Sequence, residues 1–82
     1  MRIGSWNCQG LGAPLTQSRL TSLCKLCKFD ILFLIETLNK CDVVCNLAYV
    51  LGFPNVITQP PKGHSGGLAL LWKDNVRLSN VF

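Results

Sequence analysis

The sequence predicts an α/β fold with the element order β-α-β-α-β-β-β. Short apolar runs typical of buried strands alternate with segments whose apolar residues recur at helical spacing. The first two predicted strands are separated by residues 8–29, a stretch of 22 residues. Parallel strands need a crossover of at least about a dozen residues, usually helical, so these two strands are expected to be parallel neighbours. The 82 residues suffice for one small domain.

The first half of the chain predicts two strands around one helix. Residues 2–6 form a short strand that ends at Asn7, and the glycines and proline of 10–14 predict a turn. An amphipathic helix ending near Lys28 follows, because four apolar residues recur at its spacing. These are Leu20, Leu23, Cys24 and Cys27. The apolar run 31–35 then predicts a strand buried on both faces.

The second half predicts one helix and three strands. The helix ends at Gly52, and its apolar stripe consists of Cys41, Val44, Cys45, Ala48 and Leu51. Residues 55–58 predict a short strand and 59–63 a loop. Residues 67–72 predict another apolar strand, with 76–82 as its partner across a turn. Because this last strand reaches the final residue, we expect the chain to be a fragment of a longer domain.

Composition excludes several classes of protein. The chain is 49% hydrophobic and 15% charged, unlike disordered proteins, and no apolar run approaches the ~20 residues of a membrane span. The first residues lack the apolar region of a signal peptide. The five cysteines are an odd number, which indicates free thiols in a reducing compartment. We therefore expect an intracellular protein, nuclear or cytoplasmic, that is not secreted and binds no membrane.

The charges limit the chemistry that the chain can perform. Eight lysines and arginines against four acidic residues give a net charge of +4, spread along the chain. This mild charge allows a polyanionic partner without requiring one. A complete acid–base or two-metal site would be hard to build from so few carboxylates. They are Asp30, Glu36, Asp42 and Asp74.

Two polar residues are expected at one edge of the predicted sheet. Asn7 ends the first strand and Glu36 follows the second. If these strands are parallel neighbours ~4.8 Å apart, an amide oxygen and a carboxylate lie where open α/β sheets bind ligands, within reach of one hard cation. The alternative is that Glu36 merely caps a strand and Asn7 starts a turn, because polar residues follow most strands.

Three segments carry recognisable motifs: 5–12 (SWNCQGLG), 29–37 (FDILFLIET) and 63–72 (GHSGGLALLW). In this order, and over nearly the whole chain, they resemble the endonuclease/exonuclease/phosphatase superfamily, and most closely the AP-endonuclease-like domain of plant LINE-type retrotransposon proteins that also carry reverse transcriptase. The resemblance implies the N-terminal part of a four-layer α/β sandwich, in which two mixed β-sheets are flanked by helices. It also implies metal-dependent hydrolysis of a phosphodiester, with Mg²⁺ or Mn²⁺ as cofactor and DNA as the partner of the parent protein.

The resemblance also assigns roles to individual residues. Asn7 matches a position that helps to organise the metal and the phosphate, and Glu36 matches the metal-binding glutamate. Lys62, His64 and Ser65 belong to a loop that lies near the nucleic acid in nuclease branches. Some members carry an acidic residue at the position of Gln9, so the glutamine in this chain weakens the metal site.

The resemblance implies further catalytic groups that this chain does not contain. They are a distant Asp-x-Asn pair and a closing Asp-His element. Asp74 and Asn75 lack the intervening residue and come too early, and His64 precedes its own strand. We therefore assign no catalytic residue, and expect weak Mg²⁺ binding without turnover. Without the second sheet of the sandwich, the core is expected to be incompletely covered, which favours self-association.

Rival functions rest on weaker patterns. Cys24, Cys27, Cys41 and Cys45 have the number of thiolates of a structural zinc site, so a small zinc-stabilised binding module is the alternative function. Against it, both pairs fall on apolar stripes of predicted helices, where cysteine packs as a small hydrophobic residue. A protein-interaction fragment is a third alternative. The glycines of 10–12 do not complete a dinucleotide-binding motif, and 63–67 does not form a P-loop.

Overall fold

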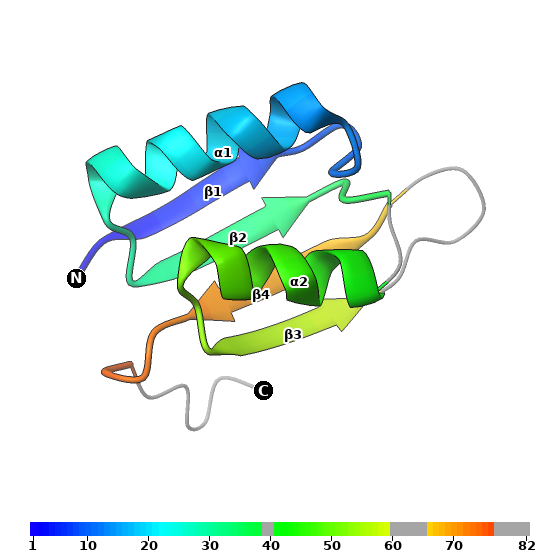
Figure 1. Cartoon of the computed structure of the whole chain (residues 1–82). Helices are drawn as coiled ribbons and strands as arrows, with labels where there is room; N and C mark the ends of the chain where they lie inside the picture. Colours follow the sequence, from blue (N-terminus) through cyan, green and yellow to red (C-terminus); the bar gives the residue numbers. More distant parts are fainter. Residues whose placement is uncertain (39–40, 60–65, 77–82) are drawn as a thin grey trace.

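The computed structural model describes residues 1–38, 41–59 and 66–76. These residues form four strands and two helices (Figure 1). The elements are β1 (Ile3–Asn7), α1 (Pro14–Cys27), β2 (Ile31–Ile35), α2 (Cys41–Leu51), β3 (Asn55–Gln59) and β4 (Leu68–Trp72). Their order, β-α-β-α-β-β, and the four-stranded mixed sheet confirm the predicted fold class. The predicted seventh element, 76–82, lies outside the described residues except for Val76, which is not in a strand.

The parallel pairing of β1 and β2 is also confirmed. Ile3 lies opposite Ile31 and Asn7 opposite Ile35, so the two strands start and end together. The crossover between them contains α1, as its length predicts. The carboxyl ends of β1 and β2 therefore meet at one edge of the sheet.

Both helices are short, and neither is long and apolar enough to cross a membrane. Helix α1 begins at Pro14, earlier than its apolar stripe indicates, because proline suits a first turn in which the backbone N–H has no partner. It ends at Cys27, where Lys28 takes the left-handed conformation with a φ of 51°. The backbone N–H of Lys28 donates to the carbonyl of Cys24 at 3.0 Å and closes the helix.

Strand β4 lies inside the sheet, whose strand order is β1-β2-β4-β3. All five residues of Leu68–Trp72 pair antiparallel with β2 on one side and with β3 on the other. The predicted pairing of 76–82 with β4 is therefore wrong, because β2 and β3 already occupy both of its sides. A turn that follows β4 is closed by the N–H of Val76, which donates to the carbonyl of Lys73 at 3.0 Å.

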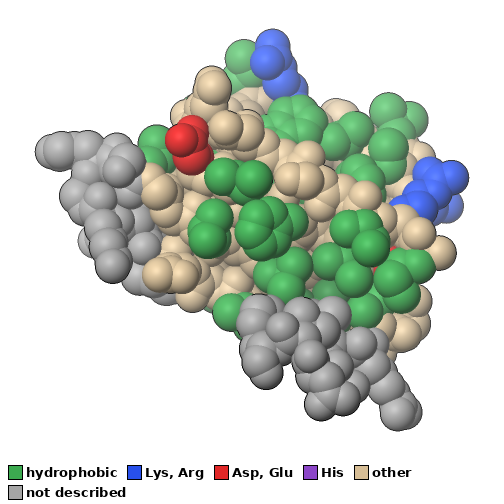
Figure 2. Space-filling view, turned by 180° about the vertical axis from the view of Figure 1, so that it is seen from behind, with side chains coloured by type: hydrophobic (Ala, Val, Ile, Leu, Met, Phe, Trp, Pro, Cys, Tyr) green, Lys and Arg blue, Asp and Glu red, His purple; other side chains and the backbone are tan. Residues whose placement is uncertain are grey.

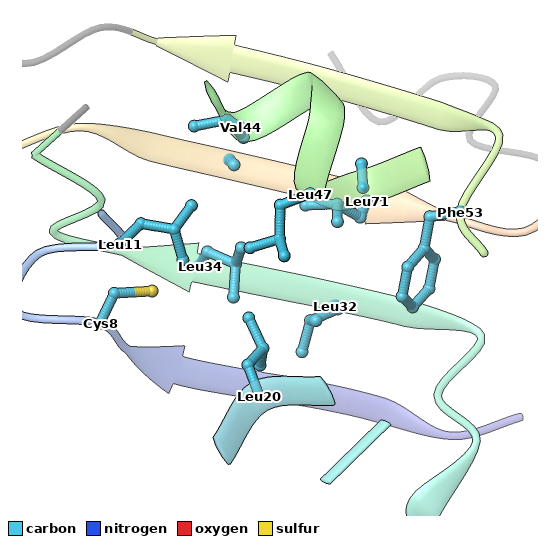
Figure 3. Close-up of a cluster of buried hydrophobic side chains, with 11 residues drawn as sticks. Cys8, Leu11, Leu20, Leu32, Leu34, Val44, Leu47, Phe53 and Leu71 are labelled. Carbon is cyan, nitrogen blue, oxygen red and sulfur yellow. The ribbon is translucent and has the colours of Figure 1, made fainter. Parts of the chain in front are cut away.

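The two helices cover the same face of the sheet, and the core lies between them and the strands (Figure 1). Leu32 and Leu34 of β2 point from the sheet into this core, where Leu20 of α1 and Leu47 of α2 meet them (Figure 3). The prediction that 31–35 is buried on both faces is wrong, because Ile31, Phe33 and Ile35 are only half-buried. Among the described residues, no layer covers the second face.

Helix α2 is rotated relative to its predicted apolar stripe. Val44, Leu47 and Ala48 are buried, whereas Cys45 is exposed. Leu47 offers more apolar surface than a cysteine, so the helix gains more by turning that side chain into the core. The predicted burial of Cys45 is therefore wrong.

Asp30 directly precedes β2 and connects it to the residues that flank β1 and β4. Its carboxylate accepts the backbone N–H of Arg2 at 2.8 Å and the side-chain amide of Asn75 at 3.4 Å, while its carbonyl accepts the N–H of Lys73 at 3.0 Å. The hydrogen bond from Arg2 and then that from Asn75 hold the pKa of this carboxyl below its usual range. Asp30 is therefore a structural carboxylate, at the edge of the sheet opposite to Asn7.

We expect Asp30 to contribute to the acid sensitivity of the fold. Its pKa is lowered on folding, so its stabilisation is present above the unfolded value of about 3.9 and is lost as pH falls through the folded value. The variant Asp30→Asn should lose less free energy of unfolding than the wild type between about pH 5 and about pH 2. Urea denaturation at several pH values measures this difference, and equal pH dependence in the two proteins would contradict it.

Candidate functional site

The candidate site is the edge of the sheet at which β1 and β2 end and β4 begins (Figure 1). Asn7 is the last residue of β1, and Glu36 immediately follows Ile35, its neighbour across the sheet. Neighbouring strands lie ~4.8 Å apart, so the two side chains start from adjacent backbones. The structure thus places the backbones of Asn7 and Glu36 at neighbouring strand ends, at the edge that the crossover length predicts.

Three loops are tied together at this edge by backbone hydrogen bonds. From the loop after β1, the N–H groups of Gly10 and Leu11 donate to the carbonyls of Glu36 and Thr37 at 3.0 and 2.7 Å. The N–H of Thr37 in turn donates to the carbonyl of Gly67 at 3.2 Å. Because the segment around Glu36 is held from both sides, its backbone position is fixed by the fold.

Glu36 has a strained backbone conformation. Its φ is 54°, in the left-handed region that is uncommon for residues with a side chain. Gln9 and Leu38, at the same edge, also have positive φ values of 49° and 54°. Each such residue costs on the order of 1–3 kcal/mol, and strain of this kind clusters at functional sites because the surrounding structure must enforce it. The conformation turns the chain away from the strand direction directly at Glu36.

Asn7 and Glu36 offer two oxygen donors of the kind that hard cations prefer. Asn7 is exposed, and its Oδ1 accepts the backbone N–H of Gln9 at 3.2 Å. A carbonyl oxygen has two lone pairs, so Oδ1 keeps one acceptor position. The Glu36 side chain is half-buried, and its carboxylate makes no hydrogen bond or ion pair with any described residue. The two side chains thus offer oxygen donors of the type that hard divalent cations take, but only two of them.

The remaining carboxylates have other positions. Asp30 and Asp74 lie at the opposite edge, where Asp74 accepts the side-chain amide of Asn55 at 3.0 Å. Asp42 lies in the first turn of α2 and accepts the backbone N–H of Val43 at 3.0 Å. Across residues 1–38, 41–59 and 66–76, no three histidine, cysteine or acidic side chains lie together in a group that could hold a metal. Asn7 and Glu36 thus form at most half of a metal site.

Thr37 is a residue that the sequence analysis did not single out as part of the site. It is 1% exposed, the only buried polar side chain in the described part of the chain. Its backbone joins the loops before α1 and before β4. The sequence feature that could have identified Thr37 is its position directly after Glu36 in the second motif. Only the folded structure shows that three loops converge on this residue.

The predicted nucleic-acid-proximal residues Lys62, His64 and Ser65 lie outside the described residues. Gly66 and Gly67, which follow them, lie at the candidate edge, with φ values of 88° and 91°. Most of the described cations lie near the opposite edge, close to the amino ends of β1 and β2. They are Arg2, Lys25, Lys28 and Lys73. These cations therefore do not supply positive charge next to Asn7 and Glu36.

The cysteines give the zinc alternative no support within the described residues. Cys24 packs against the core and Cys27 is half-buried on α1, whereas Cys45 is exposed on α2. The side chain of Cys41 is not described. Burial raises the pKa of the Cys24 thiol, which opposes formation of the thiolate that zinc requires.

Cys8 is expected to react far more slowly than Cys45. Cys8 is buried, and burial raises its pKa to about 11, so almost no thiolate forms at about pH 8. Cys45 is exposed. A time course of iodoacetamide labelling followed by peptide mass spectrometry should therefore show Cys45 modified well before Cys8 in the native protein, and equal rates in denaturant. Equal rates in the native protein would contradict the buried position of Cys8.

An open α/β sheet with oxygen donors beyond its parallel strand ends has the general architecture of ligand-binding α/β proteins. A sequence model of the endonuclease/exonuclease/phosphatase family matches residues 4–81. The chain therefore belongs to this family, in agreement with its fold. A search of curated proteins found no significant match.

Proposed function

We propose that this chain provides the N-terminal half of the metal site of a divalent-metal-dependent DNA endonuclease domain of retrotransposon type. The observation that carries the proposal is the juxtaposition of Asn7 and Glu36 at the adjacent carboxyl ends of β1 and β2. Family membership supports the phosphodiester-cleaving class, and the motif resemblance supports the retrotransposon type. In such a site, the bound ion neutralises charge on the phosphate.

The proposed ion is Mg²⁺, with Mn²⁺ as a substitute, and its binding to this chain is expected to be weak. One carboxylate and one amide oxygen are few ligands for an ion that keeps its waters unless several anionic oxygens replace them. No residue of this chain is assigned as a general base. We therefore expect metal binding in the millimolar range and no cleavage by the chain alone.

DNA is the proposed partner of the parent domain. The net charge of +4 favours weak association with nucleic acid through release of counterions from the phosphates. Such association depends strongly on salt and carries no sequence preference. We expect it to persist in variants of Glu36, because the carboxylate contributes no positive charge.

The test combines calorimetry and nicking assays on the wild type, Glu36→Gln and Asp74→Asn. Glu36→Gln removes the charged donor at the candidate edge, so Mg²⁺ and Mn²⁺ binding should be lost. Asp74→Asn removes the same charge at the opposite edge and should leave metal binding unchanged. Plasmid and abasic duplex DNA should stay intact with every protein.

Two results would contradict the proposal. Metal binding that is equal in the wild type and Glu36→Gln would exclude Glu36 as a ligand. Metal-dependent nicking that is lost in Glu36→Gln would show that the chain is active by itself, against the expected lack of turnover. Nicking that survives the substitution indicates a contaminating nuclease, which further purification removes before the assay is repeated.

A further inference from the structure

Two cysteines lie three residues apart in the last turn of α1 (Figure 1). Cys24 and Cys27 are both half-buried, and both thiols are free. Residues at this spacing in a regular α-helix have Cα atoms about 5 Å apart, inside the range of about 4.4–6.8 Å that disulfides span. Their side chains leave the helix on the same side. The fold therefore supplies a dithiol whose two sulfurs start from neighbouring positions.

The end of α1 leaves room for the adjustment that a disulfide needs. The Cβ atoms of such a pair lie about 5–6 Å apart on a helix, whereas a disulfide brings them to about 4 Å. Last turns of helices tighten readily, because 3₁₀-type hydrogen bonds replace α-type ones there. The N–H of Lys28 closes this turn, and Lys28 then leaves the helix with a φ of 51°. Tightening therefore displaces no further helical residue.

A small cleft between α1 and α2 gives access to the Cys24 thiol. Its volume is about 90 Å³. This is room for about three water molecules, so a small group can approach a thiol that otherwise packs against the core. The cleft is lined by Thr21, Cys24, Lys25, Val50 and Leu51.

The charges around the pair are mainly positive. The ammonium group of Lys73 acts electrostatically on Cys24, and the guanidinium group of Arg2 donates to the carbonyl of Cys27 at 2.9 Å. Figure 2 shows Lys and Arg side chains at its right-hand end, where α1 ends and β1 begins. These cations offset the negative end of the α1 dipole, which by itself disfavours a thiolate. Positive charge also attracts an anionic reagent to this end of the molecule.

We propose that Cys24 and Cys27 are a redox-modification site, at which an anionic low-molecular-weight disulfide such as glutathione disulfide produces a reversible disulfide within α1. Across residues 1–38, 41–59 and 66–76, the pair has no third histidine, cysteine or acidic side chain with which to hold a metal. The chemistry that remains for two adjacent thiols is exchange with a disulfide. Disulfides that form in a reducing compartment are of this transient kind.

The exchange has two steps. The thiolate of Cys27 attacks one sulfur of glutathione disulfide, whose S–S bond breaks, and one glutathione leaves as a thiolate that takes up a proton. Cys24 then loses its proton and attacks Sγ of Cys27 in the mixed disulfide, and the second glutathione leaves in the same way. Two protein thiols are thereby oxidised, and one glutathione disulfide is reduced to two glutathione thiols. Excess glutathione reverses both steps.

The order of attack follows from the surroundings of Cys24. This side chain packs against the core, and burial raises the pKa of its thiol, although the Lys73 ammonium group offsets part of the effect. Cys24 is therefore slow to attack a reagent from solution. Its position beside Cys27 gives it a high effective concentration for the second step, which suits a resolving thiol.

Peptide mapping of the full chain tests the proposal. The reduced protein is incubated with glutathione and glutathione disulfide, its free thiols are blocked with N-ethylmaleimide, and it is digested with trypsin. Trypsin cleaves after Lys25, so the disulfide should appear as peptides 20–25 and 26–28 joined to each other. With each glutathione form at about 0.1 mM, the joined peptides should exceed the mixed disulfide at Cys27 at least about tenfold. Urea should lower this ratio, because the unfolded chain does not hold the pair together.

Two variants separate the pair from the other thiols. Cys24→Ser should stop at the mixed disulfide on Cys27 and give no joined peptides. Cys45→Ser is the matched control, because it removes an exposed thiol from α2 and should leave the joined peptides unchanged. Circular dichroism establishes that both variants are folded, and the wild-type map decides alone if Cys24→Ser is not.

Three results would overturn the proposal. They are mixed disulfides on the wild type without joined peptides, joined peptides confined to a dimer band on a non-reducing gel, and a ratio that urea does not lower. Absence of any reaction at Cys27 overturns it as well. The inference goes beyond the proposed function and needs no bound metal, so its failure leaves that function untouched.

Discussion

Replacement of Leu34 by alanine should destabilise the fold by about 3 kcal/mol, the largest effect that we expect from a single substitution. Leu34 is fully buried at the centre of the core, where α1, α2 and the loop residue Leu11 converge on β2 (Figure 3). The substitution removes its apolar contacts and leaves a cavity that the rigid sheet cannot close. A small domain has only about 5 kcal/mol of stability, so a large unfolded fraction should appear.

Urea denaturation followed by tryptophan fluorescence measures this change, since Trp6 packs against the core. The matched control is Leu26→Ala, which makes the same chemical change at a leucine that is 79% exposed. It should alter the free energy of unfolding by no more than about 0.5 kcal/mol. If the two variants were equally stable, the core would not be where the structure places it.

The strands and helices were predictable because each has a local pattern. The continuous apolar run at 31–35 and the stripe that ends at Cys27 identify β2 and α1 from neighbouring residues alone. Parallel pairing of β1 and β2 followed from the length of the crossover. The neighbours of β4 were not predictable in this way. The apolar pattern of β4 is compatible both with a hairpin to the residues that follow it and with the observed pairing to β2. Only burial within the whole sheet distinguishes these two arrangements.

The position of the candidate site was predictable, but its geometry was not. Asn7 and Glu36 follow from strand ends, which the sequence marks clearly. The left-handed conformation of Glu36 has no local signal, because glutamate does not favour it. It is enforced by two backbone hydrogen bonds that involve segments far apart in sequence. The N–H of Gly10 donates to the carbonyl of Glu36, and the N–H of Thr37 donates to the carbonyl of Gly67. The burial of Thr37 has the same origin.

Substitution of Gly4 by alanine should destabilise the chain by about 2 kcal/mol, although the added side chain is a single methyl group. A Cβ atom at Gly4 would lie 2.6 Å from Cε1 and 2.8 Å from Cδ1 and Cζ of the Phe29 ring. Gly4 therefore lets this ring, which packs against the core, lie directly on β1. The clash forces either the ring or the strand to shift, and the strand carries Asn7 at its end.

A second substitution distinguishes this clash from a loss of backbone freedom. In the Gly4→Ala background, Phe29→Leu removes the ring atoms that the methyl group meets and should restore part of the lost free energy of unfolding. Ser5→Ala serves as the control, because it places an alanine at the next position of β1, on the exposed side. Its urea midpoint should stay close to that of the wild type. A Gly4→Ala protein as stable as the wild type, or one that Phe29→Leu destabilises further, would show that the ring does not rest on β1.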